Sequence, residues 1–241
     1  MFKLLLKEIN QFFSSLTGYI VLFLFVLMNG LFIWVFPGNY NVLDSGYASL
    51  NSVFQLAPWV FLFLVPAVSM RMFADEKKSG TLELLLTRPV TDLEIVMAKY
   101  LSSLVLVILS LLPTLIYYAS VYAMGNPVGN IDSGGFWGSY IGLLFLASSY
   151  AAVGVFASSL TDNQVVAFLL ALILSFVCYL GFDYIGSVFS ASEVLIVKFG
   201  INEHYRSMSR GVIDTRDVLY FLSLITLFIA GTRLSLQSRK W

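Results

Sequence analysis

The side chains able to perform chemistry are few and widely separated in this chain. His204 is the only histidine, and it lies between Glu203 and Tyr205. A serine hydrolase or a zinc protease would place such a histidine near a Gly-x-Ser-x-Gly or His-Glu-x-x-His pattern, and neither pattern occurs. We therefore expect a solvated loop histidine. Cys178 is the only cysteine and lies in an apolar run, so we expect an inert packing residue and no disulfide or structural zinc.

The sequence also lacks a nucleotide-binding loop. Such a loop needs Gly-Lys-Ser/Thr after a glycine-rich turn, so that backbone N–H groups and the lysine contact the phosphates. No Gly-Lys pair occurs anywhere in the chain, so we do not expect it to hydrolyse ATP through such a loop. Nucleic-acid binding is excluded as well, because the net charge is 0 and no basic block is present.

The composition indicates an all-α integral membrane protein. The 241 residues are 59% hydrophobic and 12% charged, with a mean hydropathy of +0.85, whereas soluble proteins are about 45–50% apolar and about 25% charged. A bilayer core of about 30 Å needs roughly 20 apolar helical residues to cross it. Six stretches reach or approach that length without any Asp, Glu, Lys or Arg, namely residues 19–36, 56–70, 100–124, 138–160, 165–182 and 218–232.

Residues 2–16 are predicted to form an amphipathic helix that lies in the membrane interface. Apolar side chains recur there at three- and four-residue steps, and polar side chains fall opposite them. The polar positions are Lys3, Lys7, Asn10 and Ser14. A signal peptide is not expected, because the apolar run that follows is too long and no small-x-small cleavage site comes after it.

The distribution of lysine and arginine predicts that both termini are cytoplasmic. Ten of the 14 basic residues fall in the N-terminal segment, the loop before the third span and the C-terminus, and none falls in the loops around Asp44 and Asp132. Cytoplasmic segments near a membrane retain positive charge. Residues 183–217 are an exception to this distribution, because they hold four basic residues. The positive-inside rule is weak for a long loop that also holds acids, so we place this loop outside the cell. Residues 194–208 are expected to form one or two short helices there.

The fourth span is rich in small side chains between residues 147 and 159. Since apolar surfaces gain nothing by leaving lipid, membrane helices associate by close packing, which small residues allow. We expect these residues to pack against neighbouring helices, with a path-lining surface as the alternative.

The stretch between the second and third spans is the most informative. Four consecutive charges at 75–78 precede Gly80 and Thr81, and residues 82–87 then predict a short apolar-rich helix. Pro89 disfavours helical geometry at the residue before it and should end this helix.

A second helix is expected to restart immediately afterwards and to lead into the third span. Thr91 and Glu94 have the spacing of a capping box. A short helix between two membrane helices can present Glu83, Thr87 and Arg88 to a soluble partner while its leucines pack against the membrane domain. A merely interfacial loop is the alternative that periodicity leaves open.

The run from Glu76 through residues 80–87 to Pro89 resembles the cytoplasmic signature of type 2 ABC-transporter permeases. Six spans, an N-terminal interfacial helix and a long last external loop are similar to that family over nearly the whole chain. Further segments resemble the GldF-type gliding-motility permeases of Bacteroidota, namely residues 29–36, 56–59, 125–130, 161–164 and 207–218.

The resemblance implies a type 2 ABC permease architecture. It implies one permease domain, 1–241, with the interfacial helix 2–16, a cytoplasmic coupling segment 75–92 and an extracytoplasmic loop 183–217. The residues that it assigns to coupling and ATPase docking are Glu76, Gly80, Thr81, Glu83, Leu84, Leu85, Thr87 and Arg88.

The partners that the resemblance implies supply the chemistry that this chain lacks. A cytoplasmic ABC ATPase would bind ATP and Mg, with no catalytic residue, cofactor or metal in the permease itself. Two ATP sites imply a second permease chain, identical or paralogous. The resemblance also implies an additional gliding-associated subunit. It further implies a location in the cell inner membrane.

Two other functions remain as alternatives. An intramembrane hydrolase needs a nucleophile and a base at membrane depth, and the histidine-free spans argue against it, although a Ser-Lys dyad stays open. A non-transporting anchor or assembly component could instead couple an ATPase to a motility or secretion apparatus. The sequence does not distinguish such an anchor from a transporter. It also does not identify a transported substrate.

Overall fold

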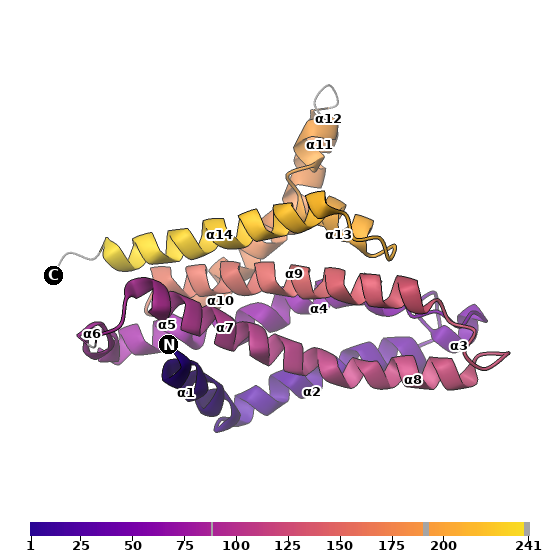
Figure 1. The fold of residues 1–241 in the computed structure, drawn as a ribbon, viewed down its shortest axis with the longest axis horizontal. Coiled ribbons are helices and arrows are strands. Elements are labelled where there is room, and N and C mark those ends of the chain that lie inside the picture. Colours follow the sequence, from indigo (N-terminus) through magenta and orange to yellow (C-terminus); the bar gives the residue numbers. More distant parts are fainter. Residues whose placement is uncertain (88, 190–192, 239–241) are drawn as a thin grey trace.

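The computed structural model describes residues 1–87, 89–189 and 193–238, and every regular element in that part of the chain is a helix (Figure 1). The predicted all-α membrane fold is thereby confirmed. Among the described residues, six helical segments are long and apolar enough to cross a membrane: Gly18–Val35, Asn51–Lys78, Asp92–Met124, Ser133–Leu160, Gln164–Val188 and Thr215–Gln237. Each overlaps one of the six predicted spans: the first is shifted by one residue, and the other five extend beyond the predicted limits.

Several spans consist of more than one helix. In chain order the elements are α1 (Phe2–Phe13), α2 (Leu16–Gly30), the π-helical turn η1 (Leu31–Val35), α3 (Val42–Ser45), α4 (Asn51–Ser69), α5 (Arg71–Lys78), α6 (Thr81–Leu86), α7 (Asp92–Leu111), the 3₁₀ turn η2 (Leu112–Thr114), α8 (Leu115–Met124), α9 (Ser133–Leu160), α10 (Gln164–Phe176), the π-helical turn η3 (Val177–Gly181), α11 (Phe182–Val188), α12 (Glu193–Val197), α13 (Ile201–Met208) and α14 (Thr215–Gln237).

The helices form an elongated bundle with two distinct ends (Figure 1). We call one the α6 end, where α1, α5, α6 and the C-terminal part of α14 lie. The other is the α3 end, which also holds the turn after α8. Helices α11 and α12 pack on each other and project away from the bundle. The first and last helices therefore reach the same end, as an even number of crossings requires.

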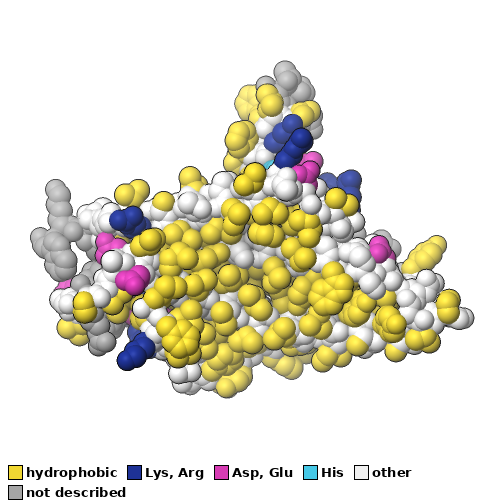
Figure 2. All heavy atoms as spheres, in the orientation of Figure 1, with side chains coloured by type: hydrophobic (Ala, Val, Ile, Leu, Met, Phe, Trp, Pro, Cys, Tyr) yellow, Lys and Arg dark blue, Asp and Glu magenta, His cyan; other side chains and the backbone are white. Residues whose placement is uncertain are grey.

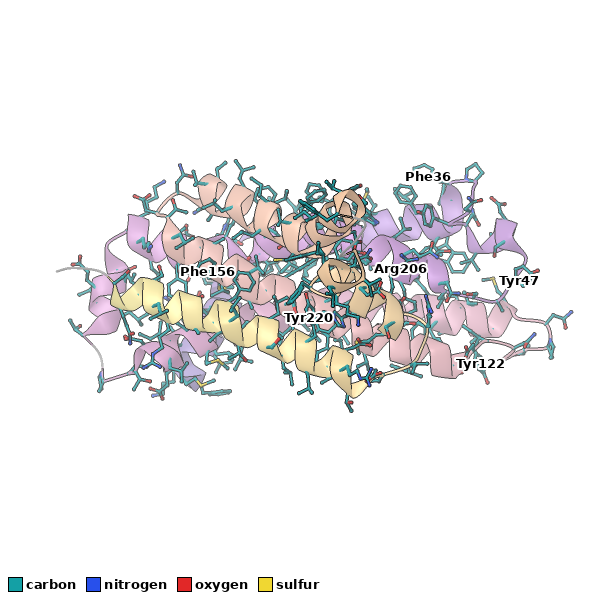
Figure 3. All side chains as sticks on the ribbon, turned by 90° about the horizontal axis from the view of Figure 1, so that it is seen from above. Phe36, Tyr47, Tyr122, Phe156, Arg206 and Tyr220 are labelled. Atoms are coloured by element: carbon teal, nitrogen blue, oxygen red, sulfur yellow. The ribbon has the colours of Figure 1, made fainter. Side chains whose placement is uncertain are left out.

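The surface of the bundle suits a bilayer. Figure 2 shows a broad apolar area over the middle of one face, with charged side chains at the α6 end, near the α3 end and at the base of the projecting segment. Exposed aromatic side chains mark the α3 end, where Phe36, Tyr47 and Tyr122 lie (Figure 3) and are 47%, 78% and 45% exposed. Aromatic side chains are enriched at membrane–water interfaces, so these residues fit the level at which the α3 end leaves the hydrocarbon.

Helix α9 is the centre of the bundle and packs against α4, α7, α10 and α14. Its small side chains are buried, among them Ala147, Ala151 and Ala157. A Cβ atom on Gly142 would lie 2.8 Å from the Cβ of Met208, so the absence of a side chain there lets α13 approach α9 closely. The expectation that the small residues of the fourth span serve helix packing is confirmed.

A hydroxyl from the loop between the last two spans replaces a hydrogen-bond donor that a proline removes from the second span. Pro58 lies inside α4 and has no N–H, so the carbonyl of Phe54, four residues earlier, loses its helical donor. The hydroxyl of Tyr205 on α13 donates to this carbonyl at 2.6 Å. Burial raises the pKa of Tyr205 well above its ordinary value near 10, so the hydroxyl keeps its proton. This bond links α13 to α4. The short helices predicted over residues 194–208 are present as α12 and α13.

Candidate functional site at the α6 end

The site begins where the second membrane-crossing segment is interrupted at Met70, between α4 and α5. The Ser158 hydroxyl of α9 donates to the Met70 carbonyl at 2.8 Å and accepts from the backbone N–H groups of Phe73 and Ala74 at 3.0 and 3.1 Å. One side chain therefore satisfies backbone groups on both sides of the break and fixes α5 against α9. Residues 75–78, expected at the start of the coupling segment, are the last turn of α5.

Helix α6 forms because Gly80 ends α5. The φ angle of Gly80 is +69°, a left-handed conformation that glycine adopts without steric cost. The chain then turns back into a helix at Thr81, and α6 ends at Leu86, two residues before Arg88, which lies outside the described residues. The short helix predicted over 82–87 is present to within one residue.

Helix α7 begins at the capping box that the sequence predicts. The Thr91 hydroxyl accepts from the Glu94 N–H at 3.3 Å, and the Glu94 carboxylate accepts from the Thr91 N–H at 3.0 Å. Two N–H groups that the helix cannot satisfy are thereby paired. The first turn of the third span is thus held in place directly after the α6 segment.

One face of α6 is anchored in the bundle and the other is free. Leu82 is 2% exposed and belongs to the core, and Leu85 is half-buried. Leu84 is 68% exposed, so the expectation that the leucines pack on the membrane domain is wrong for this residue. It shares an exposed face, which we call the α6 surface, with Gly80, Thr81, Glu83 and Thr87.

A cavity of about 420 Å³ lies beside the α6 surface, against the turn that joins α9 to α10. Its lining includes Glu83 from α6 and Asp162 from the turn. Two bonds hold its walls together: the Lys77 ammonium donates to the Ser159 carbonyl, and the Gln164 side-chain amide donates to the Asp75 carboxylate. The motif at 161–164 therefore lies next to the predicted coupling segment, which the sequence alone could not indicate.

Glu76 is not part of this surface, because its side chain belongs to an ion cluster with Lys7, Glu8 and Lys99, in which Lys7 is half-exposed and the other three side chains are buried. The Lys99 Nζ atom lies 2.8 Å from Glu76 Oε2 and 3.0 Å from Glu8 Oε1. The Lys7 Nζ atom lies 2.7 Å from Glu76 Oε1 and 3.5 Å from Glu8 Oε1. Two ammonium groups thus face two carboxylates.

Burial makes the two ion pairs of Lys99 energetically significant, whereas solvent screens the pairs of the half-exposed Lys7. The Lys99 side chain is 0% exposed, and its ammonium also donates to the Met72 carbonyl and lies 5.0 Å from the ring centre of Phe73. A buried charge that loses its partner costs about 3–5 kcal/mol. The cluster is therefore stable only while its charges remain balanced.

The cluster connects three helices that are distant in sequence. Glu8 and Lys7 come from α1, Glu76 from α5 and Lys99 from α7. Burial alone would lower the pKa of Lys7, but its hydrogen bond to Glu76 and the charges of Glu8 and Glu76 outweigh this and raise it above its ordinary value of 10.5. Glu76 lies in the last turn of α5, directly before α6. A displacement of α6 would therefore change the contacts that Glu76 makes with α1 and α7.

Sequence reasoning missed the role of Glu8 and Lys99. The sequence counts Lys99 only as one of the basic residues on the cytoplasmic side, yet its side chain is fully buried on α7. Glu8 lies four residues from both Leu4 and Phe12, which pack against the core. This spacing places Glu8 on the inward stripe of α1 and was the available signal.

His204 differs from the expectation of a solvated loop histidine. Its side chain is 16% exposed, its Nδ1 lies 2.7 Å from Asp217 Oδ1, and its Nε2 lies 2.9 Å from the Lys198 carbonyl oxygen. The ring stacks on Tyr220 at 3.9 Å. The prediction was wrong because the long loop folds back and brings α13 against the start of α14.

No candidate metal centre emerges from the described residues, in which no group of three or more His, Cys, Asp or Glu side chains could hold an ion. Cys178 is half-buried, unpaired and packed against the core, in keeping with its expected packing role.

Comparison with known proteins assigns a family to this arrangement. A family model described as ABC-2 family transporter protein matches residues 3–228, which include the whole ion cluster, α6 and most of α14. Among the curated proteins compared, none matches the chain. Because the family match covers nearly all of the six-helix fold, the chain belongs to the ABC-2 family of transporter proteins and is a multi-pass permease subunit of an ABC transporter.

Proposed function

We propose that the α6 surface is where a separate ABC ATPase docks and drives this permease. The observation that carries the proposal is the division of α6 into an anchored and a free face. Leu82 is buried in the core, while Glu83, Leu84 and Thr87 are exposed with an apolar side chain among them. An exposed leucine flanked by polar groups suits the centre of a protein interface.

The α6 end then faces the cytoplasm, where ATP is available. The support for this orientation is that the N-terminal segment, the 71–99 region and the C-terminal segment hold ten of the 14 lysine and arginine residues. ATP and Mg would be held by the ATPase, and this chain would contribute no catalytic or metal-binding residue.

The mechanism follows from the connections of α6. Binding of ATP would move the docked ATPase and with it α6. Glu76 links this end of the chain to Lys7 on α1 and to Lys99 on α7, so the motion would change how these helices pack. A ligand acts on a two-state protein by favouring one of its packings, and the balanced ion cluster must persist in both.

The proposed subunit composition and the role in gliding motility rest on sequence resemblance. A second permease chain, identical or paralogous, would complete a transporter in the bacterial inner membrane. The segments at 29–36, 56–59, 125–130, 161–164 and 207–218 support a GldF-type permease with a role in gliding motility, with a further gliding-associated subunit as partner.

The docking proposal is tested by Leu84→Asp, with Leu93→Asp as the matched control. Leu84 is 68% exposed on α6, whereas Leu93 is 45% exposed on α7 and lies outside the α6 surface. We expect Leu84→Asp to reduce copurification of the ATPase and its stimulation at least about tenfold, since a buried charge at an interface costs more than 1.4 kcal/mol. Leu93→Asp should retain both properties. A Leu84→Asp permease that still binds and stimulates the ATPase would refute the proposal.

A further inference from the structure

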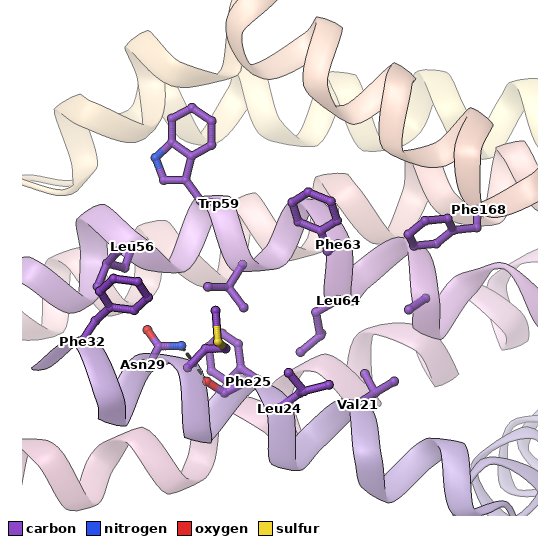
Figure 4. Close-up of a pocket in the computed structure, with 13 residues that line it drawn as sticks. Val21, Leu24, Phe25, Asn29, Phe32, Leu56, Trp59, Phe63, Leu64 and Phe168 are labelled. Carbon is purple, nitrogen blue, oxygen red and sulfur yellow. Dashed lines mark hydrogen bonds between the residues drawn. The ribbon is translucent and has the colours of Figure 1, made fainter. Parts of the chain in front are cut away.

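An apolar groove lies between α2 and α4, and none of its lining residues belongs to α6. The groove has a volume of about 510 Å³ and is closed at one side by Phe168 of α10. Its walls are aliphatic and aromatic, with Phe32 contributed by the π-helical turn η1 (Figure 4). The groove is therefore built for an apolar body, and π-helical turns frequently occur at functional sites.

Asn29 is the polar exception among the residues that line this groove. Its side chain is 0% exposed, and its Nδ2 donates to the Phe25 carbonyl at 2.8 Å, as Figure 4 shows. This bond fixes the orientation of the amide. The other end of the amide, Oδ1, is buried and has no hydrogen-bond partner.

An unpaired carbonyl oxygen in a membrane-spanning helix calls for an explanation. Leaving a buried polar atom unpaired costs about 1–3 kcal/mol, and water is scarce in hydrocarbon. The Asn29 side chain lies six residues before the end of its span at Val35, or about 9 Å along the helix axis. Because Oδ1 has no exposed surface, the side chains beside it must move apart before a donor can reach it, and that donor must arrive on a molecule that enters the hydrocarbon region.

We propose that this groove binds a membrane lipid whose apolar chain carries a neutral hydrogen-bond donor, a hydroxyl or an amide N–H, and that the donor pairs with Asn29 Oδ1. The chain would fill the space beside Phe25, Trp59 and Phe63. A plain acyl chain could occupy the same space but would leave Oδ1 unpaired, so the site distinguishes lipids by their donor. This site is independent of the docking function proposed for α6.

The test uses the full chain in phosphatidylcholine vesicles and two photoreactive probes. One probe is a long-chain alcohol with a diazirine in its chain, and the other is the methyl ether of the same alcohol. Only the alcohol can donate a hydrogen bond. After irradiation, labelled residues are identified by peptide mass spectrometry. We expect the alcohol to label the groove about fivefold more than the ether, which is the preference that one neutral hydrogen bond provides.

Three variants complete the design. Asn29→Leu should make labelling by the two probes equal, because the acceptor is gone. Thr226→Val, which removes a hydroxyl from α14, outside the groove, should keep the fivefold preference. Ala67→Phe, which fills part of the groove, should reduce labelling by both probes.

Several results would overturn the proposal. Equal labelling of the natural chain by alcohol and ether would show that Asn29 selects no donor, and this comparison needs no variant to fold. A preference that persists in Asn29→Leu would place the selective contact elsewhere. Cross-linking of the groove to a second copy of the chain, without probe labelling, would assign it to a protein contact.

Discussion

Glu76 Oε2 lies 2.8 Å from Lys99 Nζ, and this contact joins the last turn of α5 to α7 in a site where the lysine has no exposed surface. A strong dependence of stability on charge balance follows. Lys99→Met should lower the free energy of unfolding by about 3–5 kcal/mol, because it leaves Glu8 and Glu76 facing Lys7 alone. Thermal unfolding in lipid nanodiscs measures the loss.

The compensating control adds Glu8→Gln to Lys99→Met. Lys7 and Glu76, whose charged atoms are 2.7 Å apart, then remain as a neutral pair. More than half of the lost stability should return. If Lys99→Met unfolds at the temperature of the natural chain, the ion cluster contributes nothing to stability.

The pH dependence of the cluster is predicted from Lys7. Its pKa is raised above 10.5 in the folded protein, so its stabilising contribution is complete below the unfolded value and is lost as the pH rises through the folded value. The stability difference between the natural chain and Lys7→Met should thus stay constant between about pH 6 and pH 9 and shrink above about pH 10.5. Chemical unfolding at a series of pH values tests this, and a difference that changes near neutrality would contradict it.

Much of the fold was predictable because its signals are local. Six apolar runs, the turn at Gly80, the stop at Pro89 and the capping box at Thr91 each depend on a few neighbouring residues. The short helix of the coupling segment was found in this way. Its exposed face was assigned less well, since Leu84 and Leu82 are both leucines and only tertiary packing separates them.

The ion cluster could not be predicted because its members are distant in sequence. Glu8 and Lys99 are 91 positions apart, and no periodic pattern relates them. A count of charges treats Lys99 as one more cytoplasmic lysine, whereas burial beside two carboxylates gives it a structural role. The same limit applies to His204, whose partners come from a loop carbonyl and from α14.

His204 provides a prediction for the corner between α13 and α14. A carbonyl oxygen only accepts, so the Nε2 atom facing Lys198 must carry a proton, and Nδ1 faces the Asp217 carboxylate. Asp217→Leu removes the second contact and should increase hydrogen exchange of the α13 amides about tenfold. Asp217→Asn offers either a donor or an acceptor to Nδ1 and should increase exchange less. Equal exchange in both variants and the natural chain would show that this contact does not hold α13.

The bond from Tyr205 to the Phe54 carbonyl yields a prediction with an internal control. Tyr205→Phe leaves that carbonyl without a donor, because Pro58 has no N–H, and should cost about 1–3 kcal/mol of stability. In a Pro58→Ala background the helix regains its own N–H donor to Phe54. Tyr205→Phe should then cost at least about 1 kcal/mol less, and a double-mutant cycle of thermal unfolding measures this coupling. Equal costs in the two backgrounds would mean that the hydroxyl does not replace the donor that the proline removes.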